Sequence, residues 1–244
     1  MPDATCSTPA PRGRLAKRIF LVLAGVVVVW LIVAYLTMPE LWLHYTRRHP
    51  TLDDAPRITH TKDGIPGDPL NVALVGTKVE VMKIMVAAQW YPAEPLTLKS
   101  CLEIAEATVL ERPYKTAPVS NLYLFERKQD LAFERPVGHD PRQRHHVRFW
   151  KSEDVDSDGR PVWIGAAVYD EHVGFSETTG QITHVTGPDI DKERDKLMLD
   201  LKETGKLSET YFIDDFHKIH EGRNGGGDPW HTDGKMDVGV IKVE

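Results

Sequence analysis

VWIGAAVY, residues 162–169, is the stretch that decides the fold of this chain. Both alternating sets of its side chains are apolar or small, a pattern typical of a central strand that is covered on both faces. The turn sequence DSDG at 156–159 precedes it, and residues 145–150 before that turn alternate in type like a second strand. We therefore expect the core to be built on a sheet that contains strand 162–169 in its interior.

Further elements follow this strand. Residues 181–186 are expected to form another short strand. Pro188 and Asp189 then begin a helix with apolar residues at helical spacing on one face, and this helix ends near Gly205. Residues 211–213 are expected to be the last strand of the core.

The part of the domain before this strand mixes helices and strands as well. Four features are expected there: a β-rich run at 70–75, a helix after the capping box Thr77–Glu80, a second capped helix at 100–111, and a hairpin of 122–125 with 131–134. Together these elements predict an α+β domain over residues 68–217, with a mainly antiparallel sheet and packed helices.

A long apolar segment lies near the N-terminus. Residues 19–36 carry no charge, and residues 37–38 extend them to about 20 residues, which at roughly 1.5 Å per residue span the roughly 30 Å core of a bilayer. A cleaved signal peptide is the alternative, but its apolar region is shorter and ends in a small-residue cleavage site that this run lacks. We therefore expect a single transmembrane helix at 19–38, followed by the interfacial aromatics Trp42 and Tyr45.

The charges beside this segment predict its orientation. Four Lys and Arg residues precede it, and Arg47 and Arg48 follow it. The positive-inside rule therefore places the basic N-terminus, residues 1–18, in the cytoplasm and the soluble domain outside. Residues 39–67 are expected to be a juxtamembrane connector, and residues 218–244, which contain a Gly-rich run, a loose surface tail.

The composition excludes several function classes. The 244 residues carry a net charge of −6, and the part after residue 50 alone carries −10, so the chain lacks the basic surface of a nucleic-acid-binding protein. Cys6 and Cys101 lie on opposite sides of the apolar segment, which leaves no disulfide framework and no cysteine-based zinc site. The motifs GxGxxG, GxxxxGK[ST], GxSxG and HExxH do not occur.

Residues 142–150, RQRHHVRFW, carry the first group of candidate site residues. In a strand, His146, Arg148 and Trp150 share one face of the sheet. His146 is then a candidate general base or metal ligand, and Arg144 and Arg148 are candidates for binding an anionic headgroup. The alternative is a satisfied core histidine beside a solvated basic face.

Residues 183–195 carry the second group. Asp189 and Asp191 fall in the first turn of the expected helix, where capping and the helix dipole explain carboxylates without any function. If the strand with His146 pairs near His184, however, two imidazoles and a carboxylate converge, and such a set suits Zn²⁺ or another divalent ion, or a His–Asp acid/base pair. The candidate catalytic residues are therefore His146, Arg148, His184, Asp189 and Asp191, and the candidate metal ligands are His146, His184 and Asp189.

In these segments the chain resembles the LssY C-terminal domain family over residues 68–203. The matching pieces are NVALVG at 71–76, APVS at 117–120, LYLF at 122–125, QDLAF at 129–133, RHHVRFW at 144–150, GRPVWIG at 159–165, and His184 with PDID at 188–191 and ERD at 193–195. The resemblance implies a membrane-associated bacterial protein of the inner membrane, whose domain also occurs with DedA-like and phosphatidic-acid-phosphatase-like membrane modules. It implies no established activity. Val185 follows His184 where relatives often carry a second histidine, and this departure counts against a metal site.

Three functions stay open at this level. The first is an anchored domain that binds an envelope lipid or a membrane-protein partner, which needs only the anchor, an acidic domain and a few polar contacts. The second is a hydrolase, with or without a metal ion, that acts on a lipid-linked or phosphorylated envelope substrate. The third is a structural component of a membrane complex. The first is favoured because the strongest signals, the anchor and the packed core, carry no reactive group.

Overall fold

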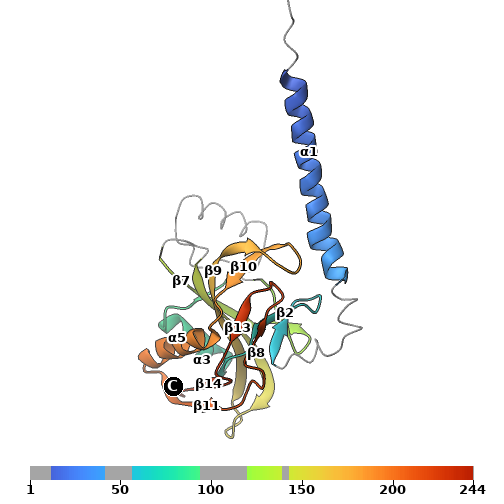
Figure 1. The fold of residues 1–244 in the computed structure, drawn as a ribbon. Helices are drawn as coiled ribbons and strands as arrows, with labels where there is room; N and C mark the ends of the chain where they lie inside the picture. The colour runs from blue at the N-terminus through green and yellow to red at the C-terminus, as the bar shows by residue number, and fades with distance from the viewer. Residues whose placement is uncertain (1–11, 42–56, 94–119, 139–142, 244) are drawn as a thin grey trace, which may run out of the picture.

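A computed structural model describes residues 12–41, 57–93, 120–138 and 143–243 of the chain. A long helix leads to a β-rich domain (Figure 1). Helix α1 (Arg12–Ile32) continues through a π-helical turn, η1 (Val33–Thr37), and the helical stretch Ala16–Leu41 has the length and apolar composition to cross a membrane. Very little of it is buried against the rest of the protein, so it is not the core helix of a soluble domain. The expected N-terminal apolar helix is confirmed.

One large sheet organises the domain. Its strand order is β11-β14-β3-β9-β8-β7-β4, with β10 paired to β9. The strands are β3 (Val72–Val75), β4 (Tyr91–Pro92), β7 (Leu131–Pro136), β8 (Arg144–Val155), β9 (Pro161–Phe175), β10 (Ile182–Thr186), β11 (Leu207–Ile213) and β14 (Met236–Ile241). Every pairing in this sheet is antiparallel except β14 with β3. Strand β9 lies between β3 and β8, so the stretch 162–169 is the interior strand that its pattern predicts.

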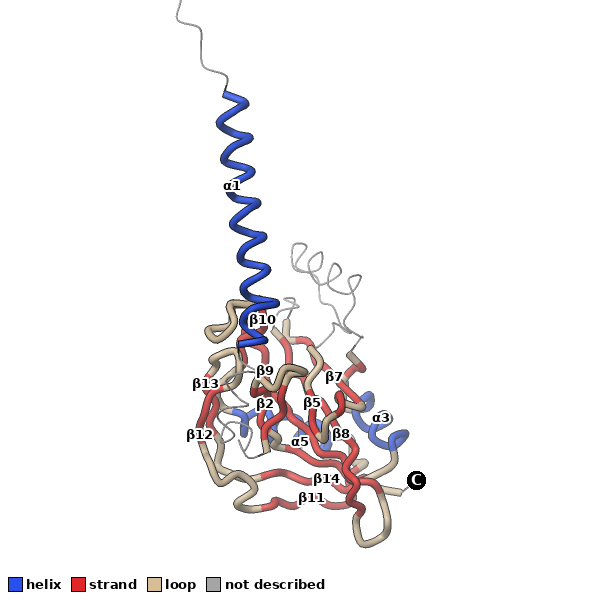
Figure 2. Tube along the Cα trace, turned by 90° about the vertical axis from the view of Figure 1, so that its right-hand side faces the viewer, coloured by secondary structure: helices blue, strands red, loops and turns tan. Residues whose placement is uncertain are grey.

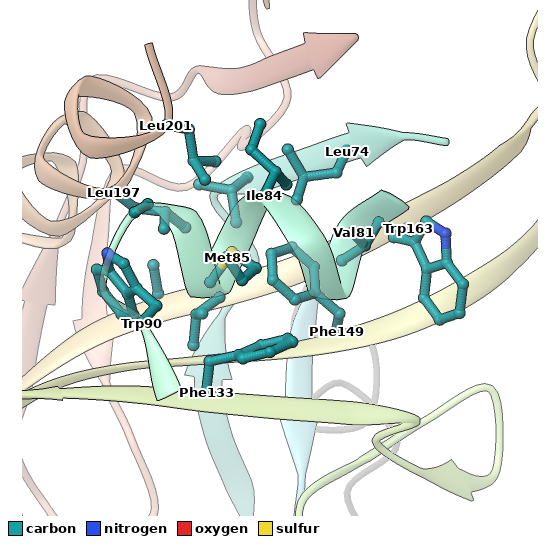
Figure 3. Close-up of a cluster of buried hydrophobic side chains, with 14 of the residues drawn as sticks. Leu74, Val81, Ile84, Met85, Trp90, Phe133, Phe149, Trp163, Leu197 and Leu201 are labelled. Carbon is teal, nitrogen blue, oxygen red and sulfur yellow. The ribbon is translucent and has the colours of Figure 1, made fainter. Parts of the chain in front are cut away.

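Two helices cover one face of this sheet. Helices α3 (Lys78–Ala87) and α5 (Ile190–Glu203) bury apolar side chains on one hydrophobic cluster with β3, β7, β8 and β9 (Figure 3). Thr77 and Glu80 form the expected capping box at the start of α3, and Asp189 caps α5. Gly165 of β9 leaves room for the ring of Phe149, since a Cβ there would lie 2.7 Å from that ring.

A second apolar cluster fills the opposite face. It includes Ala73, Trp150, Ala166 and Val238 from the large sheet, and Leu122 near a smaller sheet of order β2-β1-β5-β6. The smaller sheet consists of β1 (Ile58–His60), β2 (Pro66–Pro69), β5 (Tyr123–Leu124) and β6 (Arg127–Lys128). Strand β9 is thus covered on both faces, as the apolar character of both its alternating sets predicts.

The expected hairpin of residues 122–125 with 131–134 is wrong. Strand β5 pairs with β6 across the two residues Phe125 and Glu126, whereas β7 joins β8 and β4 in the large sheet. Phe125 and Glu126 both have a positive φ, 52° and 58°, which is the backbone of a tight two-residue hairpin turn. Strand β6 therefore lies within residues 126–130, the segment that was expected to be the polar turn of the longer hairpin.

The expected loose tail is also wrong. Within residues 218–244, β12 (Glu221–Arg223) and β13 (Pro229–His231) form a hairpin whose connection holds the Gly-rich run, and β14 enters the large sheet between β11 and β3. Met236 and Val238 of β14 are buried in the second apolar cluster, and Ile241 is buried in the first, under the helices. Strand β1 and the start of β2 lie in the segment expected to be a connector. The second capped helix, 100–111, lies outside the described residues.

The anchor helix contacts the domain directly at the β9–β10 hairpin. Figure 2 shows the lower end of the helix beside β10. The Trp30 indole donates a hydrogen bond to the carbonyl of Gly180 (3.1 Å), and the Gln181 amide donates one to the carbonyl of Ala34 (2.8 Å). The rings of Trp30 and Phe175 meet edge to face, with centroids 6.1 Å apart. The end of the anchor is therefore part of the folded structure.

Candidate functional site

A pocket of about 560 Å³ lies where the anchor meets the domain. Tyr35 of η1 lines it on one side, and side chains of β8, β9 and β10 line it on others. The turn before β2 and the glycines after Asn224 complete it. Its volume falls within the usual range of small-molecule sites, roughly 300–1,000 Å³.

Buried charged residues form one side of this pocket. Arg144 donates from Nη1 to Glu134 Oε2 (2.8 Å) and from Nε to Asp170 Oδ2 (3.0 Å). Arg148 donates from Nη1 to Asp68 Oδ2 (2.6 Å). All five side chains are at most one tenth exposed, so each guanidinium is needed to compensate a buried carboxylate.

His146 connects the two ion pairs. Its Nδ1 lies 3.1 Å from Asp170 Oδ2, and its Nε2 lies 2.6 Å from Nη1 of Arg148. A guanidinium only donates hydrogen bonds, so this arrangement requires a neutral ring that donates from Nδ1 and accepts at Nε2. A second proton would make Nε2 a donor and redirect it towards Asp68, whose Oδ2 is 3.8 Å away.

The environment lowers the pKa values of both pocket carboxyls, although their burial alone would raise them. Burial alone would raise the pKa of the Asp170 carboxyl, but the charges of His146, His184 and Arg144 hold it far below its usual range. Burial likewise opposes the charge on Asp68, but His146, whose Nε2 lies 3.8 Å from Oδ2, and the guanidinium of Arg148 together lower the pKa of this carboxyl.

The pKa values of the two imidazoles are shifted in opposite directions. Burial lowers the pKa of His184, which stays neutral at pH 7. Burial and the charge of Arg148 also oppose a charge on His146, but the two nearby carboxylates, Asp170 first and then Asp68, together raise the pKa of this ring.

Two polar groups of the pocket wall lack partners among the described residues. Asp170 Oδ1 is buried and accepts no hydrogen bond, although Oδ2 of the same carboxylate is held by Arg144 and His146. The ring of His184 lines the pocket, and no hydrogen bond to it occurs within the described part of the chain. A buried carboxylate oxygen without a donor is costly. The pocket therefore favours a ligand that supplies one.

The charged network is expected to make the domain sensitive to acid. The folded pKa values of Asp68 and Asp170 are lowered, so the stability that these charges contribute is fully present above about pH 4 and is lost as the pH falls through the folded values. The imidazoles partly cancel each other, because below about pH 6.5 the lowered pKa of His184 costs stability while the raised pKa of His146 adds it.

The measurement is thermal unfolding of the full-length protein in detergent micelles between pH 7 and pH 3. The transition temperature should fall mainly below about pH 4. Asp68→Asn removes one of the two carboxylates, so this variant should be less stable at pH 7 and lose less on acidification. Equal acid sensitivity of both proteins would show that the network does not carry the effect.

The structure brings four of the predicted residues together and leaves two apart. Arg144, His146, Arg148 and His184 all line the pocket. His146 and His184 approach through β9, which pairs with β8 on one side and β10 on the other, rather than through a direct pairing of their own strands.

Asp189 and Asp191 lie outside the pocket. Asp189 caps α5 and pairs with Lys192. Asp191 holds Arg194 and accepts from the hydroxyl of Thr232. The interpretation of Asp189 as a helix cap is therefore confirmed. Asp189 does not lie with His146 and His184 in the pocket. Within the described ranges, no group of three or more His, Cys, Asp or Glu side chains is placed to hold a metal ion.

Three carboxylates of the site were not singled out from the sequence. Asp170 follows directly on the stretch 162–169 and continues the alternation of β9, so its place on the strand was available as a signal. Glu134 lies directly opposite His146 in the pairing of β7 with β8. Asp68 belongs to the turn-like cluster 66–69, where nothing in the pattern indicates that its side chain is buried under Arg148.

Comparison with known proteins gives one match. The sequence model of a family described as LssY C-terminus matches residues 52–236, from just before β1 to the first residue of β14. No curated protein matches the chain, and no solved structure does. Every charged residue of the pocket lies within the matched range, whereas Tyr35 of the anchor lies before it.

Proposed function

The chain belongs to the LssY C-terminus family, and from this premise we propose that it is a membrane-anchored protein that binds a membrane lipid in the pocket beside its apolar helix. We further propose the bacterial inner membrane as its location, with the domain on the outer side. The basic residues before the apolar segment and the family resemblance support this placement.

The place of Tyr35 is the observation that carries the proposal. This residue belongs to the apolar helix, yet it lines the same pocket as His146 and Arg148. The helix crosses the bilayer, so a molecule that leaves the lipid layer along it meets the pocket without passing through bulk water. A pocket for a soluble substrate would have no need of this position.

The lining of the pocket suits an amphiphilic ligand. Apolar side chains, including Ile65, Val173 and Ile182, lie in its wall together with hydroxyl and amide groups. The buried charged network of β8 and β9 is at another part of the same wall. Acyl chains pack against apolar side chains, whereas a headgroup needs hydrogen-bond partners, and the pocket offers both.

The charged network selects the kind of headgroup. Arg144 and Arg148 are already paired with carboxylates, so neither is an open clamp for an anion. Three carboxylates and two guanidiniums leave the network with one net negative charge when both imidazoles are neutral. Asp170 Oδ1 still needs a donor. We therefore propose a headgroup with an amine or hydroxyl donor, rather than one that offers only acceptors.

Two lipids with identical acyl chains, one whose cationic headgroup has N–H donors and one whose headgroup carries methyl groups instead, provide the test. The full-length protein, delipidated in detergent, is titrated with phosphatidylethanolamine or phosphatidylcholine of identical acyl chains, and bound lipid is counted by native mass spectrometry. A charge-assisted hydrogen bond contributes about 1.5–3 kcal/mol, so the ethanolamine lipid should bind about tenfold more tightly or better. Equal binding of the two lipids would refute the proposed headgroup.

A pair of histidine variants supplies the control. His184→Ala removes a ring from the pocket wall and should weaken binding of the ethanolamine lipid. His172→Ala changes an exposed histidine of the neighbouring strand that does not line the pocket, and it should bind as the wild type does.

A hydrolase is the second candidate, because His146 and Asp170 have the contact of an acid/base dyad. However, Nε2, the ring nitrogen of His146 that does not contact Asp170, accepts from Arg148, and His146 is only 3 % exposed. A substrate would have to displace the guanidinium before Nε2 could take a proton. The same mass spectra distinguish the two functions, since a hydrolase would release lipid fragments of lower mass.

A further inference from the structure

We propose that residues 175–182, the tip of the β9–β10 hairpin, insert into the lipid bilayer that the anchor helix crosses, with Phe175 and Ile182 in contact with lipid. This inference concerns how the domain sits on the membrane. It does not depend on which molecule the pocket binds.

The contacts of the hairpin tip place it beside the apolar part of the anchor. The carbonyl of Gly180 accepts from the Trp30 indole, the amide of Gln181 reaches the Ala34 carbonyl, and the backbone N–H of Ile182 donates to the hydroxyl of Tyr35 (3.2 Å). Trp30, Ala34 and Tyr35 all precede Met38, the last residue of the apolar run. The tip therefore contacts the anchor before that run ends.

The length of the apolar run gives the depth of Trp30 in the bilayer. The run begins at Ile19, directly after Arg18, and a core of roughly 30 Å takes about 20 residues at about 1.5 Å each, so the far boundary falls near Met38. Trp30 precedes Met38 by eight residues, about 12 Å along the axis. Side chains in a helix tilt towards its N-terminus, which places the indole no shallower than its own backbone. The partner of this indole, Gly180, is thus on the lipid side of the boundary.

The backbone N–H groups of the tip are satisfied within the protein. Each N–H from residue 176 to residue 182 has a hydrogen-bond partner. The acceptors are, in order, Gln181 O, Gly226 O, Ser176 Oγ twice, Ser176 O, Thr179 Oγ1 and the Tyr35 hydroxyl. A turn in water has no such requirement, because water satisfies its free groups, whereas in lipid each unsatisfied group is costly.

The anchor contributes one acceptor through its π-helical turn. In an α-helix the N–H of Met38 would bond the Ala34 carbonyl, but here it bonds the Val33 carbonyl instead. The Ala34 carbonyl is left for the side chain of Gln181. The π-helical turn thus leaves the Ala34 carbonyl without a helical partner, and the hairpin supplies the missing hydrogen-bond donor.

Two side chains of the hairpin tip are of the apolar type expected in contact with lipid. Phe175 and Ile182 are cross-strand partners and are 67 % and 54 % exposed, so two large apolar groups lie next to each other on the surface. Glu177 is the one acidic residue in the segment 175–182, and it pairs with Arg223 at 3.4 Å. An exposed apolar pair beside an apolar helix fits a lipid environment, whereas the Glu177–Arg223 pair, with both side chains mostly exposed, needs a position that polar headgroups or water reach.

Depth-dependent quenching tests the inference. In the full-length chain, Cys6 and Cys101 are replaced by serine and a single cysteine is introduced by Phe175→Cys, labelled with an environment-sensitive fluorophore. The protein is reconstituted in phosphatidylcholine vesicles that contain lipids with a nitroxide on the acyl chain. We expect a blue-shifted emission and loss of most of the signal to the nitroxide lipids.

Val155 provides the matched control position. It is 58 % exposed and lies at the other end of the long β8–β9 pair, beside the turn that joins the two strands. A probe at Val155→Cys should keep the emission of a water-exposed dye and resist the nitroxide lipids, whereas a probe at Ile182→Cys should be quenched like that at residue 175. If the probes at 175 and 182 are quenched no more than the probe at 155, the hairpin does not enter the bilayer and the inference is wrong. Lipid selectivity in detergent is measured separately, so either proposal can fail alone.

Discussion

A chain truncated after Lys218 is expected to lose its folded domain. The deletion removes β14, which lies between β11 and β3 and buries Met236, Val238 and Ile241 almost completely. Loss of a large buried apolar side chain costs about 2–5 kcal/mol, so three of them approach the whole stability of a typical domain, about 5–15 kcal/mol. Strand β11 would also lose its partner in the sheet.

Circular dichroism and limited proteolysis of the detergent-solubilised proteins measure this loss. The truncated chain should show little β-structure and rapid digestion of everything after the anchor. A chain that ends at Lys242 lacks only two residues, of which Val243 is exposed, and it should behave as the intact protein does. A protease-resistant domain in the chain truncated after Lys218 would mean that residues 219–244 are the dispensable tail that their composition predicts.

Arg144→Met is expected to have the largest effect of any single substitution in the site. The change preserves much of the side-chain volume but leaves Glu134 and Asp170 buried without their shared guanidinium. Removing one partner from a buried ion pair costs about 3–5 kcal/mol, because the remaining charges are not compensated. For a chain of this size the transition temperature should then fall by roughly 6–20 °C.

Arg127→Met is the matched control for this variant. Arg127 also pairs with a carboxylate, that of Asp130, but its side chain is 40 % exposed. Water screens such a pair, so the change should cost only about 0–1 kcal/mol. Thermal unfolding of the three proteins at pH 7 gives the comparison. Equal losses for the two variants would show that the charges around Arg144 are solvated in solution.

Local patterns predicted the centre of the fold and missed elements that depend on distant pairing or on an unusual backbone conformation. The interior strand 162–169, the capping box at Thr77 and the capped helix after Asp189 all follow from residues near one another in the chain. The place of β14 does not, because its partner β3 lies far away in the sequence. The short hairpin of β5 and β6 was missed since Phe125 and Glu126 adopt a backbone conformation that neither residue type indicates.

In the candidate site too, local patterns predicted some side chains, and the placement of others depends on pairing between distant strands. The alternation along residues 144–150 correctly placed His146 and Arg148 on one face of a strand. Asp68, Glu134 and Asp170 come from three other strands, so their convergence on these side chains depends on the order and register of strands in both sheets. Asp189 and Asp191 lie outside the pocket, and the capping and helix-dipole interactions that the sequence also predicts account for carboxylates in a first helical turn.

The parallel pairing of β14 with β3 constrains when the domain can form during synthesis. Val72 pairs with Asp237, a residue 165 positions later in the chain. The sheet therefore stays incomplete until β14 has left the ribosome. Pairings of such long sequence separation form slowly. A nascent chain that remains unfolded this long exposes its apolar strands to chaperones for the whole of that time.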